Sequence, residues 1–80
     1  MENFEKYKTA FIEAFQVEES QLKGLKYQDV EEWDSVGHMG LMTDLEEAFD
    51  IEMDIDDIID FSSFEKGMEI VGKYNIDING

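Results

Sequence analysis

The stretch from Asp34 to Phe49, which reads DSVGHMGLMTDLEEAF, predicts the central helix of the chain. Asp34 and Ser35 carry side-chain oxygens of the kind that cap helix N-termini, and the apolar pattern that follows has the helical period of about 3.6 residues. We therefore expect a helix from Ser35 to Phe49 with two distinct faces. The expected core face consists of His38, Leu41, Met42, Leu45, Ala48 and Phe49. The opposite face consists of Val36, Met39, Gly40, Thr43, Glu46 and Glu47.

This opposite face is apolar beside Ser35 and acidic one to two turns further on. A face that meets only water does not need Val36 and Met39, and methionine adapts to varied partners, so we interpret these six residues as a docking surface. Gly40 within a helix costs about 1 kcal/mol relative to alanine, which suggests a close approach at this position. The alternatives are a solvated acidic face and a glycine without a specific role.

The sequence on either side predicts three more helices. Aromatic and apolar residues at helical spacing predict a first helix from Asn3 to Gln16 with a buried stripe, and residues 17–34 read as a long loop. Residues 51–61 are expected to form a loop that leads into a short helix. Ser62 and Glu65 suggest a capping box for a last helix through Met68, Val71 and Tyr74, and residues 75–80 are expected to fray. The aromatic stripe consists of Phe4, Tyr7, Phe11, Ile12 and Phe15.

These elements predict an all-α fold for residues 1–80 as a single domain. The expected architecture is a small four-helix bundle with a long loop between the first and second helices and a short third helix.

The composition excludes several classes of protein. The chain of 80 residues has 21 acidic side chains, six lysines, no arginine and no cysteine, which gives a formal net charge of −15. Ten of the acids and no base lie in residues 34–62. This charge disfavours nucleic-acid binding and favours basic protein partners, while the missing cysteines exclude disulfides and thiolate metal sites. No apolar run approaches the roughly 20 residues of a membrane span, and residues 1–8 do not resemble a signal peptide, so a cytoplasmic location is expected. We also expect a monomer.

Ser35 has three possible roles. It can cap the helix, act as a nucleophile, or accept a group that another enzyme attaches. His38 is the only histidine and is expected to point to the core, and no glycine stands two residues before Ser35, as a nucleophile elbow requires. We therefore do not expect an enzyme or any catalytic residue.

Four acids from Asp50 to Asp56 fall at positions one, three, five and seven of a calcium-loop count. Position six is Ile55 where glycine is needed, and position twelve is Phe61 where a glutamate is needed. We expect no dedicated metal site, although loose binding of divalent ions by clustered carboxylates stays open.

Three segments together carry a family resemblance. These are Leu25-Lys26-Tyr27-Gln28-Asp29, then Glu32-Trp33-Asp34-Ser35-Val36-Gly37-His38-Met39, then Leu45-Glu46-Glu47-Ala48-Phe49-Asp50-Ile51. With the small size and the acidity, they make nearly the whole chain similar to an acyl carrier protein.

The resemblance implies that a phosphopantetheinyl transferase uses coenzyme A and magnesium to place 4′-phosphopantetheine on the Ser35 hydroxyl. Acyl groups would then be carried as thioesters on this arm and presented to acyl-loading, condensing or acyl-transfer enzymes with basic docking patches. Asp34 would belong to the attachment motif. Val36, Met39, Glu46 and Glu47 would lie on the face that partners recognise.

Some residues depart from the common family pattern. Val36 stands where leucine is more frequent, Gly37-His38 is closer to specialised carriers, and Gly40 stands where an acid is frequent. These departures favour a specialised biosynthetic pathway, such as one that makes polyketide-like products, surface glycans or lipids, over housekeeping fatty-acid synthesis. The resemblance also implies that the core near Leu45, Phe49 and Ile58 shelters an acyl chain. An unmodified acidic adaptor that docks on a basic partner is the alternative.

Overall fold

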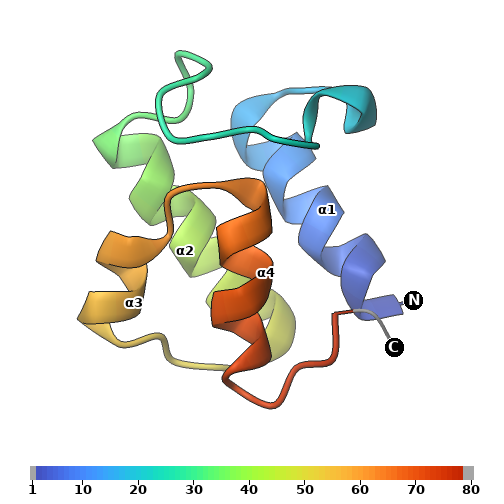
Figure 1. Ribbon diagram of the computed structural model, residues 1–80, viewed down its shortest axis with the longest axis vertical. Coiled ribbons are helices and arrows are strands. Elements are labelled where there is room, and N and C mark those ends of the chain that lie inside the picture. The colour runs from blue at the N-terminus through green and yellow to red at the C-terminus, as the bar shows by residue number, and fades with distance from the viewer. Residues whose placement is uncertain (1, 79–80) are drawn as a thin grey trace.

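The computed structural model describes residues 2–78, and in that range it contains four α-helices and no strand. The helices are α1 (Glu2–Phe15), α2 (Ser35–Phe49), α3 (Ile55–Asp60) and α4 (Phe64–Gly72), and a short 3-10 helix, η1, spans Glu19–Gln21. Figure 1 shows α4 in front, with α1 on one side and α3 on the other, and α2 behind. The all-helical prediction is thus confirmed for the described residues.

The aromatic stripe of α1 forms the centre of the core. Tyr7, Phe11 and Phe15 are fully buried. The Phe15 ring stacks on Trp33 at a centroid distance of 4.9 Å, and the Phe11 ring meets Trp33 edge-on at 5.5 Å. Large aromatic rings in such tilted and stacked contacts supply much of the buried apolar area of a small domain. Trp33 therefore anchors the segment before α2 onto α1.

One face of α2 packs into this core, but not all the residues expected there do so. Leu41, Met42, Leu45 and Phe49 are buried. His38 is half-buried and Ala48 is exposed, so the prediction was wrong for Ala48. Alanine is a weak guide to burial because its small methyl group gains little from leaving water.

The segment between α1 and α2 contains η1 and is held to the start of α4. The Tyr27 N–H donates to the Ser62 carbonyl at 2.9 Å, and the Phe64 N–H donates to the Leu25 carbonyl at 2.8 Å. These bonds accompany an isolated antiparallel bridge between Lys26 and Ser63. The segment is thereby fixed across the end of the bundle, as Figure 1 shows.

The cap of α4 is Ser63, and not Ser62 as the sequence suggested. The Ser63 hydroxyl accepts the Lys66 N–H at 3.0 Å. Glu65 does not complete a capping box, because its carboxylate accepts the Gly24 N–H at 2.9 Å. The bridge between Lys26 and Ser63 determines which serine caps α4, since it fixes where the chain turns into the helix.

The remaining contacts fasten α3 and the last described residues. On α3, the Asp57 carboxylate accepts hydrogen bonds from Lys73 and Tyr74, which directly follow α4. Ile78 is buried and Asn3 donates to the Asp77 carbonyl at 3.2 Å, so residues 75–78 pack back toward α1 and the expectation of fraying was wrong there. Residues 79–80 lie outside the described range. No helix within residues 2–78 is long and apolar enough to cross a membrane.

Candidate functional site

Ser35 is the first residue of α2 and is exposed. Asp34 caps the helix, because its carboxylate accepts the Gly37 N–H at 2.8 Å. Among residues 2–78 the Ser35 hydroxyl has no hydrogen-bond partner. The structure therefore gives the cap to Asp34 and leaves the Ser35 hydroxyl open to solvent.

Gly37 is needed for this geometry, which the sequence did not indicate. A Cβ atom at Gly37 would lie 1.8 Å from the Glu32 carbonyl oxygen. Real Cβ atoms essentially never lie closer than 3.0 Å to such a neighbouring heavy atom. Only glycine therefore lets the first turn of α2 pass so close to the preceding loop. Gly37 therefore fixes the path of the chain around Ser35.

His38 is engaged by its neighbours and not by Ser35. Its Nδ1 lies 2.9 Å from Nε1 of Trp33, and its Nε2 lies 2.7 Å from the Ile58 carbonyl oxygen. A general base must be within hydrogen-bond reach of the proton that it removes. Because both ring nitrogens are occupied, His38 is not placed to act as a base for the Ser35 hydroxyl.

Most of the proposed docking surface is present on the outside of α2. Val36 is 80% exposed and Met39 is 51% exposed. Gly40, Thr43 and Glu47 are exposed as well. The Thr43 hydroxyl donates to the Met39 carbonyl at 3.1 Å and so stays on the helix surface.

One expectation about this face needs correction. Glu46 is half-buried, and its carboxylate accepts the N–H of Met53, in the loop that leads into α3, at 2.9 Å. A Cβ atom at Gly40 would meet nothing within 4 Å in the described chain, so the close approach that the glycine suggested stays a prediction about a partner. The exposed residues of the proposed docking surface are therefore Val36, Met39, Gly40, Thr43 and Glu47.

A pocket of about 330 Å³ lies beside this surface, between α2, α3 and the loop before α2. It is lined by Tyr27, His38, Met39, Ile58, Ile59, Phe61 and Ser62. Most of these side chains are apolar, which suits an apolar or weakly polar ligand group.

Sequence reasoning missed two exposed residues on α3. Ile55 is 73% exposed and Ile59 is 71% exposed. They are four residues apart, so they share one face of the helix. The available signal was the number of isoleucines in so short a helix, because a six-residue helix cannot bury apolar side chains on every side.

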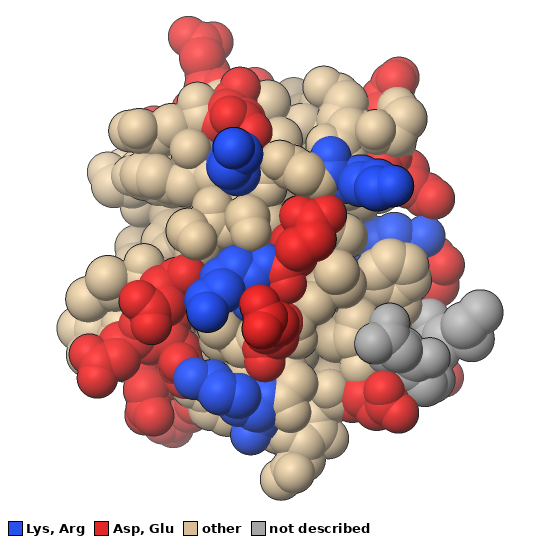
Figure 2. Space-filling model, viewed as in Figure 1, with Lys and Arg blue, Asp and Glu red and all other residues tan. Residues whose placement is uncertain are grey.

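Carboxylates surround these apolar side chains. Figure 2 shows acidic side chains gathered over α3 and lysine side chains beside them over α4. The hydrogen bonds from Lys73 and then Tyr74 hold the pKa of Asp57 below its usual value. Asp54, Asp56 and Asp60 on or beside α3 are exposed, so this end of the molecule is strongly negative.

The acids counted from Asp50 do not enclose an ion. Residues 55–60 form α3, so the chain from Asp54 onward is not a loop that wraps around a cation. Within residues 2–78, no group of three or more histidine, aspartate or glutamate side chains is placed to hold a metal.

A comparison of the chain with models of protein families, with curated proteins and with solved structures finds no match.

Proposed function

We propose that this chain is an acyl carrier protein, in which Ser35 receives 4′-phosphopantetheine from a phosphopantetheinyl transferase. The observation that carries the proposal is an exposed serine hydroxyl with no bonding partner, at the start of α2, directly after a capping aspartate. Such a hydroxyl is accessible to an enzyme that brings its own base and its own donor, coenzyme A with magnesium. The chain itself is proposed to be non-catalytic.

The surroundings of Ser35 support a carrier that is handled by several enzymes. Val36, Met39, Gly40, Thr43 and Glu47 offer an adaptable apolar contact with an acidic margin, and Ile55 and Ile59 extend the apolar area onto α3. Partners with basic patches around an apolar contact would be steered to this end of the molecule. We propose acyl-loading, condensing and acyl-transfer enzymes of a specialised cytoplasmic pathway as these partners, with the carrier acting as a monomer.

The pocket lined by Met39, four residues after Ser35, is the proposed resting place of the acyl group. Ile58 also lines it, whereas Leu45 and Phe49 are buried in the core. An acyl chain that enters here would contact Met39, Ile58 and Ile59 first. Nuclear magnetic resonance tests this by comparing the methyl signals of these residues in short-chain and long-chain acylated forms. Unchanged signals would argue against the pocket.

The second candidate is an unmodified acidic adaptor, which is favoured by the ten carboxylates and no base in residues 34–62. Two variants, Ser35→Ala and Glu47→Lys, distinguish the two functions. Incubation with coenzyme A, magnesium and a broad-specificity transferase should add one phosphopantetheine to the wild-type chain and none to Ser35→Ala. If Ser35→Ala keeps full biological activity while Glu47→Lys loses it, the adaptor is correct and the carrier is not.

A further inference from the structure

The His38 ring is held by two hydrogen bonds of opposite kind. The Trp33 indole N–H can only donate, so His38 Nδ1 is the acceptor across the 2.9 Å contact. The Ile58 carbonyl can only accept, so His38 Nε2 carries the proton across the 2.7 Å contact. The geometry therefore requires the neutral ring with its proton on Nε2.

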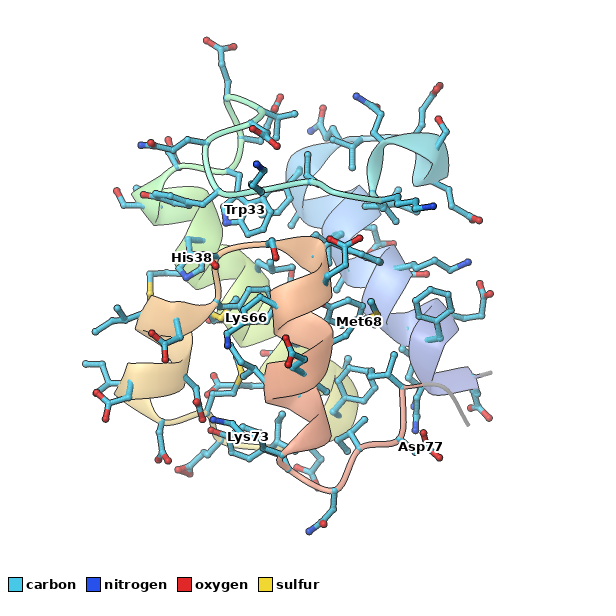
Figure 3. All side chains as sticks on the ribbon, viewed as in Figure 1. Trp33, His38, Lys66, Met68, Lys73 and Asp77 are labelled. Atoms are coloured by element: carbon cyan, nitrogen blue, oxygen red, sulfur yellow. The ribbon has the colours of Figure 1, made fainter. Side chains whose placement is uncertain are left out.

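These two bonds connect three parts of the molecule. Trp33 ends the loop two residues before Ser35, His38 lies in the first turns of α2, and Ile58 belongs to α3. Figure 3 shows the Trp33 and His38 side chains next to each other at one end of the bundle. Trp33 is fully buried against Phe15, so its indole N–H has no access to water as a substitute acceptor.

We propose that His38 is a proton-operated latch between the loop that carries Trp33 and the α2–α3 pair. Uptake of one proton from solvent at Nδ1 turns the acceptor into a donor, so two N–H groups then face each other and the bond to Trp33 is lost. The bond from Nε2 to Ile58 survives, because this nitrogen donates in both charge states. Protonation therefore breaks the bond to Trp33 in the loop and keeps the bond to Ile58 on α3.

The ring contacts of His38 with Tyr27 and Phe61 are aromatic and carry no charge. Tyr27 and Phe61 meet the ring edge-on at centroid distances of 5.6 and 6.0 Å. Asp34, the cap residue before α2, accepts the Gly37 N–H at Oδ1 and forms no ion pair with His38. The positive end of the α2 dipole further opposes a cation in the first turn.

Two carboxylates of α3 face elsewhere. Asp57 is bonded to Lys73 and Tyr74, and Asp60 lines a separate hollow with Lys66 and Lys73. No carboxylate within residues 2–78 forms an ion pair with His38. Protonation thus gives a positive charge to the His38 side chain, which lines the 330 Å³ pocket and was neutral and fully hydrogen-bonded before.

The latch rests on the donor and acceptor roles of the two ring nitrogens. It does not rest on the proposed function, because both bonds are made by the unmodified chain.

The test uses the single tryptophan and single histidine of the chain. Nuclear magnetic resonance of the full, unmodified, ¹⁵N-labelled protein follows the Trp33 indole N–H and the His38 Cε1–H together while the pH is lowered from about 8 to about 5. The latch predicts one shared titration. It also predicts that hydrogen exchange at the indole, corrected for its intrinsic pH dependence, becomes faster by about tenfold or more as the hydrogen bond is lost.

Two variants serve as controls. His38→Gln, which has no titratable ring, should show an indole signal that is flat across this range. Trp33→Phe should take up its His38 proton at higher pH than the wild type, since the bond that favours the neutral ring is gone. An indole signal that stays unchanged while His38 titrates would overturn the latch. So would a ring that remains neutral down to pH 5, or an unshifted titration in Trp33→Phe.

Discussion

The carboxylate of Glu46 accepts the Met53 N–H at 2.9 Å and so ties the last turn of α2 to the loop that leads into α3. Glu47, the next residue, is exposed and lines the groove between α1 and α2. Two neighbouring acids of the same type therefore have different roles. Glu46 orders the path to α3, and Glu47 contributes surface charge.

This difference predicts opposite responses to charge reversal. Glu46→Lys should lower the free energy of unfolding by about 1–3 kcal/mol, because it leaves the partly buried Met53 N–H without its acceptor. Glu47→Lys should change it by no more than about 0.5 kcal/mol, as is usual at exposed positions. Urea unfolding followed by circular dichroism measures both. Equal losses in the two variants would contradict the assigned roles, whereas Glu46→Gln, which keeps an acceptor oxygen, should recover part of the stability.

The bonds to Asp57 predict a specific acid sensitivity. Because Lys73 and Tyr74 lower the pKa of Asp57 in the folded state, its contribution to stability is present above the unfolded value of about 3.9 and is lost as the pH falls through the lower folded value. Asp57→Asn should therefore be less stable than the wild type at pH 6, and the difference should shrink toward pH 2. Asp56→Asn is the matched control, since Asp56 is exposed on the same helix. A difference that is independent of pH would show that the charge of Asp57 is not what holds α3.

Two glycines of α4 differ in the space around them. A Cβ atom at Gly67 would lie 2.2 Å from both the Phe61 ring and the Tyr7 hydroxyl, while one at Gly72 would meet nothing within 4 Å. Gly67→Ala should destabilise the chain by about 1–3 kcal/mol through overpacking. Gly72→Ala should be neutral or stabilise it by up to about 1 kcal/mol. Thermal unfolding of the two variants provides the comparison, and a Gly67→Ala protein as stable as the wild type would disprove the close packing of α1 and α4.

The acidity around α3 predicts electrostatically steered docking of the proposed partners. Exposed charges are screened beyond a Debye length of about 8 Å at 0.15 M salt. The association rate with a phosphopantetheinyl transferase should thus fall steeply between low and physiological salt, while the dissociation rate changes little. Stopped-flow mixing of the two proteins measures these rates. An association rate that is flat in salt would exclude a charge-led encounter.

Much of the helical framework could be predicted because it depends on local pattern. The aromatic spacing in residues 4–15 and the capping residues before Ser35 are signals within one or two turns of chain. The observed α1 and α2 begin and end within one residue of the expected bounds. The buried face of α2 followed from the same periodicity, except at the small Ala48 and the polar His38.

The failures have tertiary causes. The choice between Ser62 and Ser63 as the cap depends on the bridge to Lys26, which lies far away in sequence. The inward turn of Glu46 depends on where the loop passes at Met53, and the necessity of Gly37 depends on the Glu32 carbonyl. Side-chain spacing does not encode such backbone approaches. The spacing also did not decide between Asp34 and Ser35 as the cap of α2, and the structure gives the cap to Asp34.

The most direct measurement of the central claim is the site and extent of modification by a phosphopantetheinyl transferase. The purified chain is incubated with the transferase, coenzyme A and magnesium, weighed intact, and then digested and sequenced by fragmentation. We expect a gain of one phosphopantetheine, located on Ser35, absent from Ser35→Ala and retained in Ser62→Ala, because Ser62 is also exposed but is not the proposed site. No gain in the wild type, or a gain that persists in Ser35→Ala, would contradict it.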